Sequence, residues 1–197
     1  MSVATSPVIL ASSSPRRQEL LAQAGVQYTV HVSGCDETQT PGESAQEMVE
    51  RLALLKAKEV ARHYPDAWVI GADTTVFIGG VCLGKPTSTE EAFEMLKAIQ
   101  GKTHQVWGGI AIVRERSQHA ICWSHVTSVT MCAMSDAMIR QYVATGEPLD
   151  KAGSYAIQGI GLQFVDRIDG SYSNVVGLNI ASLMEKLREL QSHAERT

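Results

Sequence analysis

The sequence predicts an α/β fold, a mixed twisted sheet with helices on its flanks. Short apolar runs typical of buried strands alternate along the chain with amphipathic segments of helical period. Helix start and stop signals separate these segments throughout. The 197 residues, 44% of them hydrophobic, suffice for a sizeable core. Neither a repeat nor a clear linker divides the chain, so we expect a single domain over residues 1–197.

The first elements are a strand and a helix. An apolar run over residues 8–11 predicts the strand. Ser14 then stands where a helix N-cap belongs, and Pro15 suits the first helical position. Gly25 is a typical helix stop. We therefore expect a helix over residues 15–24.

Serine caps begin three further helices. Ser44 with Glu47, and Ser88 with Glu91, have the spacing of a capping box, and Ser135 is a third N-cap. These signals predict helices over residues 44–62, 88–101 and 135–145, and an amphipathic pattern predicts a last helix over residues 179–190. Apolar and alternating runs predict the remaining strands, over residues 28–32, 68–78, 81–83, 105–113, 120–131 and 163–168.

The strand over residues 68–78 carries two glycine features. We expect Gly71-Ala72-Asp73 to interrupt it, and Gly79-Gly80 to form a tight hairpin turn before residues 81–83. The turn begins a near match to a phosphate-binding loop. The match fails at Pro86, which has neither the hydroxyl nor the N–H that such a loop needs.

The pair Arg16-Arg17 lies in the first turn of the first predicted helix. That end of a helix carries partial positive charge and favours acids. Two cations beside unpaired backbone N–H groups make sense if an anion binds there, and a strand–loop–helix corner suits phosphate. The alternative is that the arginines are solvated or pair with acids such as Glu19.

Two acids and a lysine supply further candidate chemistry. Asp73 is expected at the end of an apolar strand, and Glu37 lies in a polar loop. Two carboxylates together with phosphate oxygens commonly hold magnesium, although each acid alone is more often a cap or a solvated charge. Lys85 is held in an extended segment by Pro86, and its alternative is a surface lysine.

A glycine-rich stretch over residues 149–159 forms the third candidate cluster. Its small residues permit close backbone approach, and Lys151 could reach a phosphate. The Gln158 amide offers a donor and an acceptor together, although a structural loop amide is an equal alternative. The histidines show no metal-ligand spacing and are interpreted as structural.

Bulk properties exclude several classes. A net charge of −4 disfavours a general nucleic-acid binder. We expect no signal peptide in residues 1–7 and no membrane-spanning stretch. The cysteines are scattered without a C-x-x-C pair, which indicates reduced thiols in a cytosolic protein; they are Cys35, Cys82, Cys122 and Cys132.

Together the motifs resemble the Maf family, and the match runs in order over nearly the whole chain. The matching stretches are Ala11-Ser12-Ser13-Ser14-Pro15-Arg16-Arg17, Gly71-Ala72-Asp73-Thr74, Gly84-Lys85-Pro86 and Asp150-Lys151-Ala152-Gly153 through Gln158-Gly159. The resemblance implies a cytoplasmic nucleoside triphosphate pyrophosphatase. It further implies two lobes around a cleft, as in the inosine triphosphate pyrophosphatases (Maf/Ham1 fold), a divalent cation, Mg or Mn, and a homodimer.

The resemblance also separates two branches of the family. The dTTP/UTP branch has Arg, Thr and Gln at three specificity positions, and this sequence has Arg16, Thr74 and Gln158 there. The branch acting on 7-methyl-GTP has Trp, Gln and Glu. A Gln amide complements both the N3–H and a carbonyl of uracil or thymine, whereas a carboxylate only accepts. The expected substrates are therefore dTTP, UTP or modified pyrimidine nucleotides, in a house-cleaning role.

The roles that the resemblance implies are assigned by position. Asp73 and Lys85 are the expected catalytic residues, and Glu37 and Asp73 the expected metal ligands. The expected substrate-binding residues are Ser12, Arg16, Arg17, Thr74, Lys151 and Gln158. Two alternatives are a 7-methyl-GTP pyrophosphatase of the same family and a non-catalytic regulator of cell division or septum formation.

Overall fold

A mixed sheet forms the centre of the protein in a computed structural model, which describes residues 6–194. Its strand order is β2-β1-β3-β5-β6-β7, with β4 paired to β3. The two pairs that involve β1 are parallel and the others antiparallel. The strands are β1 (Val8–Leu10), β2 (Thr29–Val30), β3 (Trp68–Ile78), β4 (Val81–Leu83), β5 (Thr103–Arg114), β6 (His119–Met131) and β7 (Val165–Asp169).

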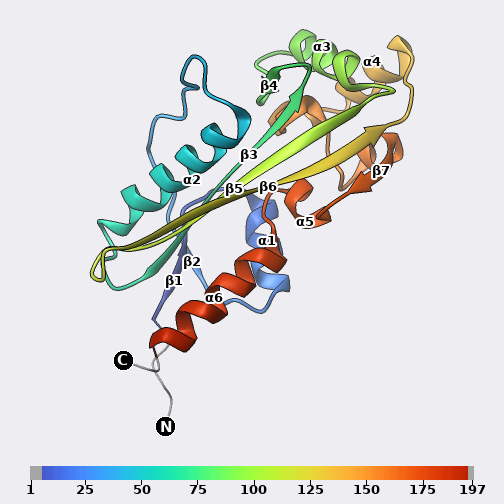
Figure 1. The fold of residues 1–197 in the computed structure, drawn as a ribbon. Coiled ribbons are helices and arrows are strands. Elements are labelled where there is room, and N and C mark those ends of the chain that lie inside the picture. Colours follow the sequence, from blue (N-terminus) through green and yellow to red (C-terminus); the bar gives the residue numbers. More distant parts are fainter. Residues whose placement is uncertain (1–5, 195–197) are drawn as a thin grey trace.

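Helices cover both faces and one end of this sheet (Figure 1). They are α1 (Pro15–Gln23), α2 (Ala45–Ala61), α3 (Thr89–Ile99), α4 (Asp136–Ala144), α5 (Tyr172–Val176) and α6 (Ile180–Ala194). The short 3₁₀ helices are η1 (Glu147–Asp150), η2 (Ala152–Ser154) and η3 (Ile160–Phe164). The predicted α/β class, with a mixed sheet flanked by helices, is confirmed.

The core falls into groups at the two ends of the long strands. Around β1 and the first half of β3, α2 packs on one face, while α1 and α6 pack on the other. At the far end, α3 and α4 pack with η3 against β3, β5 and β6. Ile70 and Leu183 are fully buried in the first group, and burying such a side chain contributes about 2 kcal/mol. The two groups form lobes that share the central strands.

Helix α2 lies unusually close to the sheet because glycines face it. A Cβ at Gly71 would lie 2.1 Å from the carbonyl oxygen of Ala53, and one at Gly109 would lie 2.1 Å from that of Val49. Gly71 therefore serves close packing, and the prediction that it helps interrupt the strand is wrong: β3 runs unbroken over Trp68–Ile78.

Most predicted signals act as expected. Ser44 and Glu47 form the capping box of α2, and Gly79-Gly80 forms the hairpin turn with both residues at positive φ. Ser14 occupies the N-cap of α1, but its side chain caps nothing; instead, its backbone N–H donates to Ser12. The short helix α5 was not predicted.

The described residues contain no helix that is both long and apolar enough to cross a membrane. All four cysteines are free. The first five residues, part of the segment where no signal peptide was expected, lie outside the described residues, as do residues 195–197.

Candidate active site

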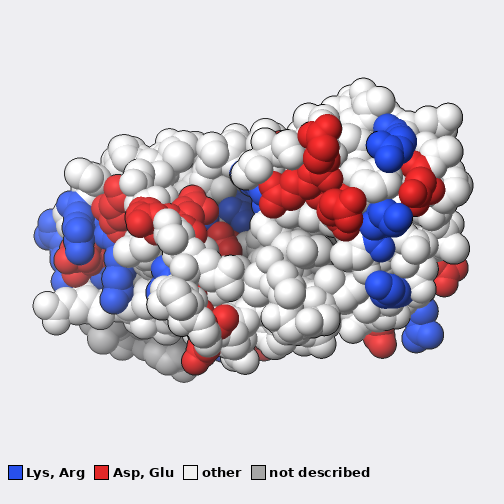
Figure 2. Space-filling view, turned by 90° about the horizontal axis from the view of Figure 1, so that it is seen from above, with Lys and Arg blue, Asp and Glu red and all other residues white. Residues whose placement is uncertain are grey.

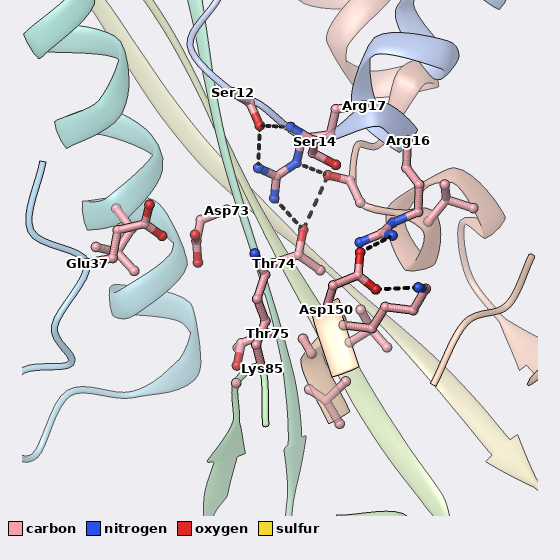
Figure 3. Close-up of a pocket in the computed structure, with 18 of the residues that line it drawn as sticks. Ser12, Ser14, Arg16, Arg17, Glu37, Asp73, Thr74, Thr75, Lys85 and Asp150 are labelled. Carbon is pink, nitrogen blue, oxygen red and sulfur yellow. Dashed lines mark hydrogen bonds and ion pairs between the residues drawn. The ribbon is translucent and has the colours of Figure 1, made fainter. Parts of the chain in front are cut away.

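A cavity of about 580 Å³ opens between the lobes, and every predicted site residue lines it (Figure 3). The lining comes from the loop that enters α1, the loop after β2, helix α2, strand β3, the segment after β4, and the 3₁₀ region. The volume is typical of a small-molecule site. The predicted members of the lining are Ser12, Arg16, Arg17, Glu37, Asp73, Thr74, Lys85, Lys151 and Gln158.

Strand β3 supplies opposite walls of the cavity through neighbouring residues. Successive side chains of a strand point to opposite faces. Asp73 points toward α2, whereas Thr74 points toward α1 and the residues that follow α5 (Figure 3). Asp73 pairs with Gly109 of β5 in the middle of the strand, so its predicted place at a strand end is wrong.

Lys56 of α2 joins the two predicted acidic residues. Its ammonium donates to Asp73 Oδ1 at 2.8 Å and to Glu37 Oε2 at 2.7 Å. The Lys56 and Asp73 side chains are nearly buried, while that of Glu37 is 56% exposed. A buried carboxylate needs such a partner, because an unpaired charge in the interior costs several kcal/mol.

Burial raises the pKa of Asp73 from its usual value, and the charges of Lys56 and Arg17 oppose the rise. Desolvation disfavours the charged form of any acid. The carboxylate is consequently a stronger proton acceptor than an exposed aspartate.

Lys56 was not among the predicted site residues, although the sequence holds a signal for it. Leu52, Ala53, Ala57 and Val60 form the buried stripe of α2, and Lys56 falls within that stripe. A lysine on the apolar face of an amphipathic helix requires a buried partner, and this one points to Asp73.

Arg17 is held in place by three acceptors. Its guanidinium donates to the Gly177 carbonyl at 2.9 Å, to Ser12 Oγ at 3.1 Å and to Thr74 Oγ1 at 3.1 Å. The Thr74 hydroxyl in turn donates to the Gly177 carbonyl. Burial lowers the pKa of Arg17, while the charges of Asp73 and Glu37 oppose this. Among residues 6–194, two of its five N–H groups have no acceptor and stay available to a ligand.

The other cations lie around the cavity mouth. Arg16 forms an ion pair with Asp150 at 3.4 Å, and Lys151 donates to Asp150 at 2.5 Å and to the Glu147 carbonyl at 2.8 Å. Within residues 6–194 the exposed Lys85 and the half-buried Gln158 have no side-chain hydrogen-bond partner. Both are free to contact a ligand.

The donor set fits a hard divalent cation. Asp73 and Glu37 each use one carboxylate oxygen on Lys56, and the other oxygen of each has no partner in the described part of the chain. In the described part of the chain no group of three His, Cys, Asp or Glu side chains could hold a metal by itself. Mg²⁺ is usually held by one or two carboxylates plus substrate phosphates, and this site offers the two carboxylates.

Cations and carboxylates line one cavity, and such a lining could bind a polyanion together with a divalent cation. A family model described as Maf-like protein matches residues 7–190, and the chain belongs to this Maf family. The resemblance found in the motifs is thus confirmed.

Curated relatives agree over most of the chain. A dTTP/UTP pyrophosphatase of Desulfotalea psychrophila is 49% identical, covering 92% of this chain and 93% of the relative. One of Shigella dysenteriae is 48% identical over 95% and 94% of the two chains. A third, of Geobacter sulfurreducens, is 44% identical over 93% and 96%.

Proposed function

We propose that this protein hydrolyses dTTP and UTP to the monophosphate and pyrophosphate. One observation carries the proposal: residues from separate segments, selected for phosphate, metal and base recognition, line one cavity. The curated relatives bear the name of this activity. The proposal includes modified pyrimidine nucleotides whose bases present the same hydrogen-bonding edge. The names of the curated relatives favour neither the 7-methyl-GTP alternative nor the regulatory one.

The reaction follows from the buried acid. The free oxygen of Asp73 accepts a proton from a water molecule as the water oxygen attacks the α-phosphorus. The bond from the α-phosphorus to the α–β bridging oxygen breaks, and pyrophosphate leaves with that bond's electron pair. Lys56 holds the carboxylate in place and keeps it ionised before the transfer.

Charge neutralisation falls to the cations of the cavity. Arg17, Lys85 and Lys151 face the cavity and stabilise the triphosphate as its negative charge redistributes. Glu37 and Asp73 would hold the divalent cation, Mg or Mn, whose chemistry is to polarise phosphate oxygens and offset their charge. The free oxygen of Asp73 has two lone pairs, so one would bind the cation while the other accepts the proton.

Base selection is assigned to Gln158, Arg16 and Thr74. The Gln158 amide has no partner among the described residues and can pair with the N3–H and a carbonyl of a pyrimidine. Arg16 reaches a carbonyl or phosphate once a ligand competes with the exposed Asp150. Thr74 acts through Arg17, since its hydroxyl already binds Arg17 and Gly177.

The surface charges support a small-molecule substrate. Basic and acidic side chains are interspersed on the face seen in Figure 2, whereas a nucleic-acid binder presents a basic stripe or patch. A cytoplasmic homodimer stays a proposal from the family resemblance, and sedimentation of the purified protein tests its dimeric part.

The deciding experiment is a panel of nucleoside triphosphates with Mg²⁺ or Mn²⁺, scored for pyrophosphate release. We expect release from dTTP and UTP above all, and its loss in excess EDTA. No release from any triphosphate would overturn the enzyme assignment. Preferential use of 7-methyl-GTP would overturn the substrate assignment alone.

A further inference from the structure

We propose that Glu147, which lies outside the cavity lining, is a positioning residue that sets base selectivity by holding the loop over residues 151–161. The loop carries Lys151 and Gln158. This inference rests on the proposed function and extends it to a residue without substrate contact.

The Glu147 carboxylate binds the far side of the loop. Its Oε1 accepts from the backbone N–H of Ile160 at 2.8 Å, and its Oε2 accepts from that of Gly161 at 2.8 Å. Two consecutive backbone N–H groups thus enclose one carboxylate, a nest arrangement that suits an anion. The contact fixes the chain two and three residues after Gln158.

Tyr142 of α4 fixes the chain before Gln158. Its hydroxyl donates to Glu147 Oε2 at 2.6 Å and accepts from the backbone N–H of Ala156 at 3.0 Å. The ring is buried against Phe164. Gln158 therefore lies in a short segment tied at both ends, and both ties meet at one carboxylate.

Glu147 also holds Lys151, the other site residue carried by the loop. Its carbonyl oxygen accepts from Lys151 Nζ at 2.8 Å. Displacing Glu147 would therefore move two groups at once: the Gln158 amide, expected to recognise the base, and the Lys151 ammonium, expected to bind phosphate.

The packing leaves little freedom around these bonds. Gly159 has φ of +98°, and a Cβ there would lie 2.2 Å from Glu147 Oε1. A Cβ at Gly161 would lie 2.4 Å from the Tyr142 hydroxyl. The glycines let the backbone reach the carboxylate and the phenol. Gly159 makes the close approach predicted for residues 149–159, and Gly161 lies beyond that stretch.

Glu147 remains ionised at neutral pH. Burial by itself would raise its pKa, but hydrogen bonds from Tyr142, Ile160 and Gly161 outweigh burial and hold the pKa below its ordinary value. A charged acceptor forms stronger hydrogen bonds than a neutral one. The amide in Glu147→Gln loses the charge and places an NH₂ against at least one of the donors.

The test compares Glu147→Gln with Tyr142→Phe and with a matched control. Glu47→Gln is the control, because Glu47 also accepts from a hydroxyl and a backbone N–H, but at the start of α2. For each protein, kcat and KM are measured with dTTP and with CTP, whose base presents the reversed donor and acceptor pattern.

We expect the dTTP-over-CTP ratio of kcat/KM to fall roughly tenfold in Glu147→Gln, mostly through KM for dTTP. Tyr142→Phe should lower the ratio too, and the double variant should lower it by less than the product of the single effects. The ratio should be unchanged in Glu47→Gln. A loss of thermal stability in Glu147→Gln with an unchanged ratio would mean a merely structural role and overturn the inference.

A second readout does not depend on turnover. Amide hydrogen exchange at Ile160 and Gly161 should accelerate roughly tenfold in Glu147→Gln, since the opening of these bonds becomes easier. Unchanged exchange would overturn the positioning role. Absence of pyrophosphate release by the wild type is a different result, because it contradicts the proposed function while the exchange data still decide the placement of the loop.

Discussion

Lys56 and Asp73 lie 17 residues apart in the chain, and their side chains meet at 2.8 Å inside the protein. The contact joins the middle of a helix to the middle of a strand. Glycines at the helix–sheet contact let the two elements approach closely enough for it. The candidate reaction centre is thereby built on the most regular part of the fold.

Lys56→Gln should leave the buried Asp73 without the ammonium group that pairs with it. The pKa of Asp73, already raised by burial, should rise further, so the acid limb of the kcat/KM profile should move to higher pH. Removing one partner of a buried pair costs about 3 kcal/mol, which urea unfolding would detect. Lys58→Gln, at an exposed position of the same helix, is the control. An acid limb at the same pH in both variants would contradict the pairing.

Asp73→Asn should nearly abolish turnover, because an amide cannot accept the proton from water. Its shape is close to that of aspartate, so the circular dichroism spectrum should match that of the wild type. The measurement is pyrophosphate release from dTTP at saturation. Turnover within a fewfold of the wild-type rate would remove Asp73 from the mechanism.

Gln158→Glu should weaken use of dTTP and UTP, because a carboxylate cannot donate to a pyrimidine carbonyl and repels the phosphates. A mismatched polar pair in a substrate site lowers kcat/KM by roughly a factor of 10² or more. The kcat/KM values for a nucleotide panel report the change. An unchanged substrate profile would sink the base-reading role.

His104 should make folding stability depend on pH. Burial lowers its pKa from 6.5 to about 4, and its ring contacts the Tyr155 hydroxyl at 2.8 Å. Below pH 6.5 His104 takes up a proton in the unfolded chain, whereas in the folded protein it does so only near its lowered pKa of about 4. The contribution of His104 to the free energy of unfolding is constant above pH 6.5 and falls by about 3 kcal/mol between pH 6.5 and 4.

His104→Gln should reduce this slope in urea unfolding across the same pH range, whereas His63→Gln, at an exposed position, should leave it intact. Carboxylates that titrate in the same pH range contribute equally to the slopes of all three proteins, so their effect cancels in the comparison with wild type. Equal slopes in all three proteins would show that His104 does not control the acid sensitivity.

Gly71→Ala should force α2 away from β3, because its Cβ would lie 2.1 Å from a backbone oxygen that cannot rotate aside. Overpacking of this kind costs about 3 kcal/mol. Gly84→Ala is the control, since a Cβ there meets nothing within 4 Å. Similar unfolding midpoints for the two variants would argue against the tight helix–sheet contact.

Local signals in the sequence predicted local structure well. The Ser44–Glu47 capping box and the Gly79-Gly80 turn act within a few residues, and both form as expected. Gly71 was misread because its reason lies 18 residues away, in the backbone of Ala53. Helix α5 escaped prediction because five residues are too few to show a period.

The candidate site shows the same division. Motif resemblance selected residues that do line one cavity, although their roles stay predictions. Lys56 and Glu147 were missed because each functions through partners distant in sequence, Asp73 in one case and Ile160 in the other. The place of Lys56 in the apolar stripe of α2 indicates a buried partner but does not say which residue it is, and the sequence around Glu147 carries no such signal.

The alternation along β3 has a consequence for how this protein can change. Asp73 and Thr74 are neighbours in the chain, yet one faces α2 and the other faces Arg17. Inserting or deleting one residue just before them would turn the acid toward the arginine and the hydroxyl toward the lysine, exchanging the two walls at a stroke. Surface loops tolerate changes of length, but β3 before Asp73 can vary only in residue identity.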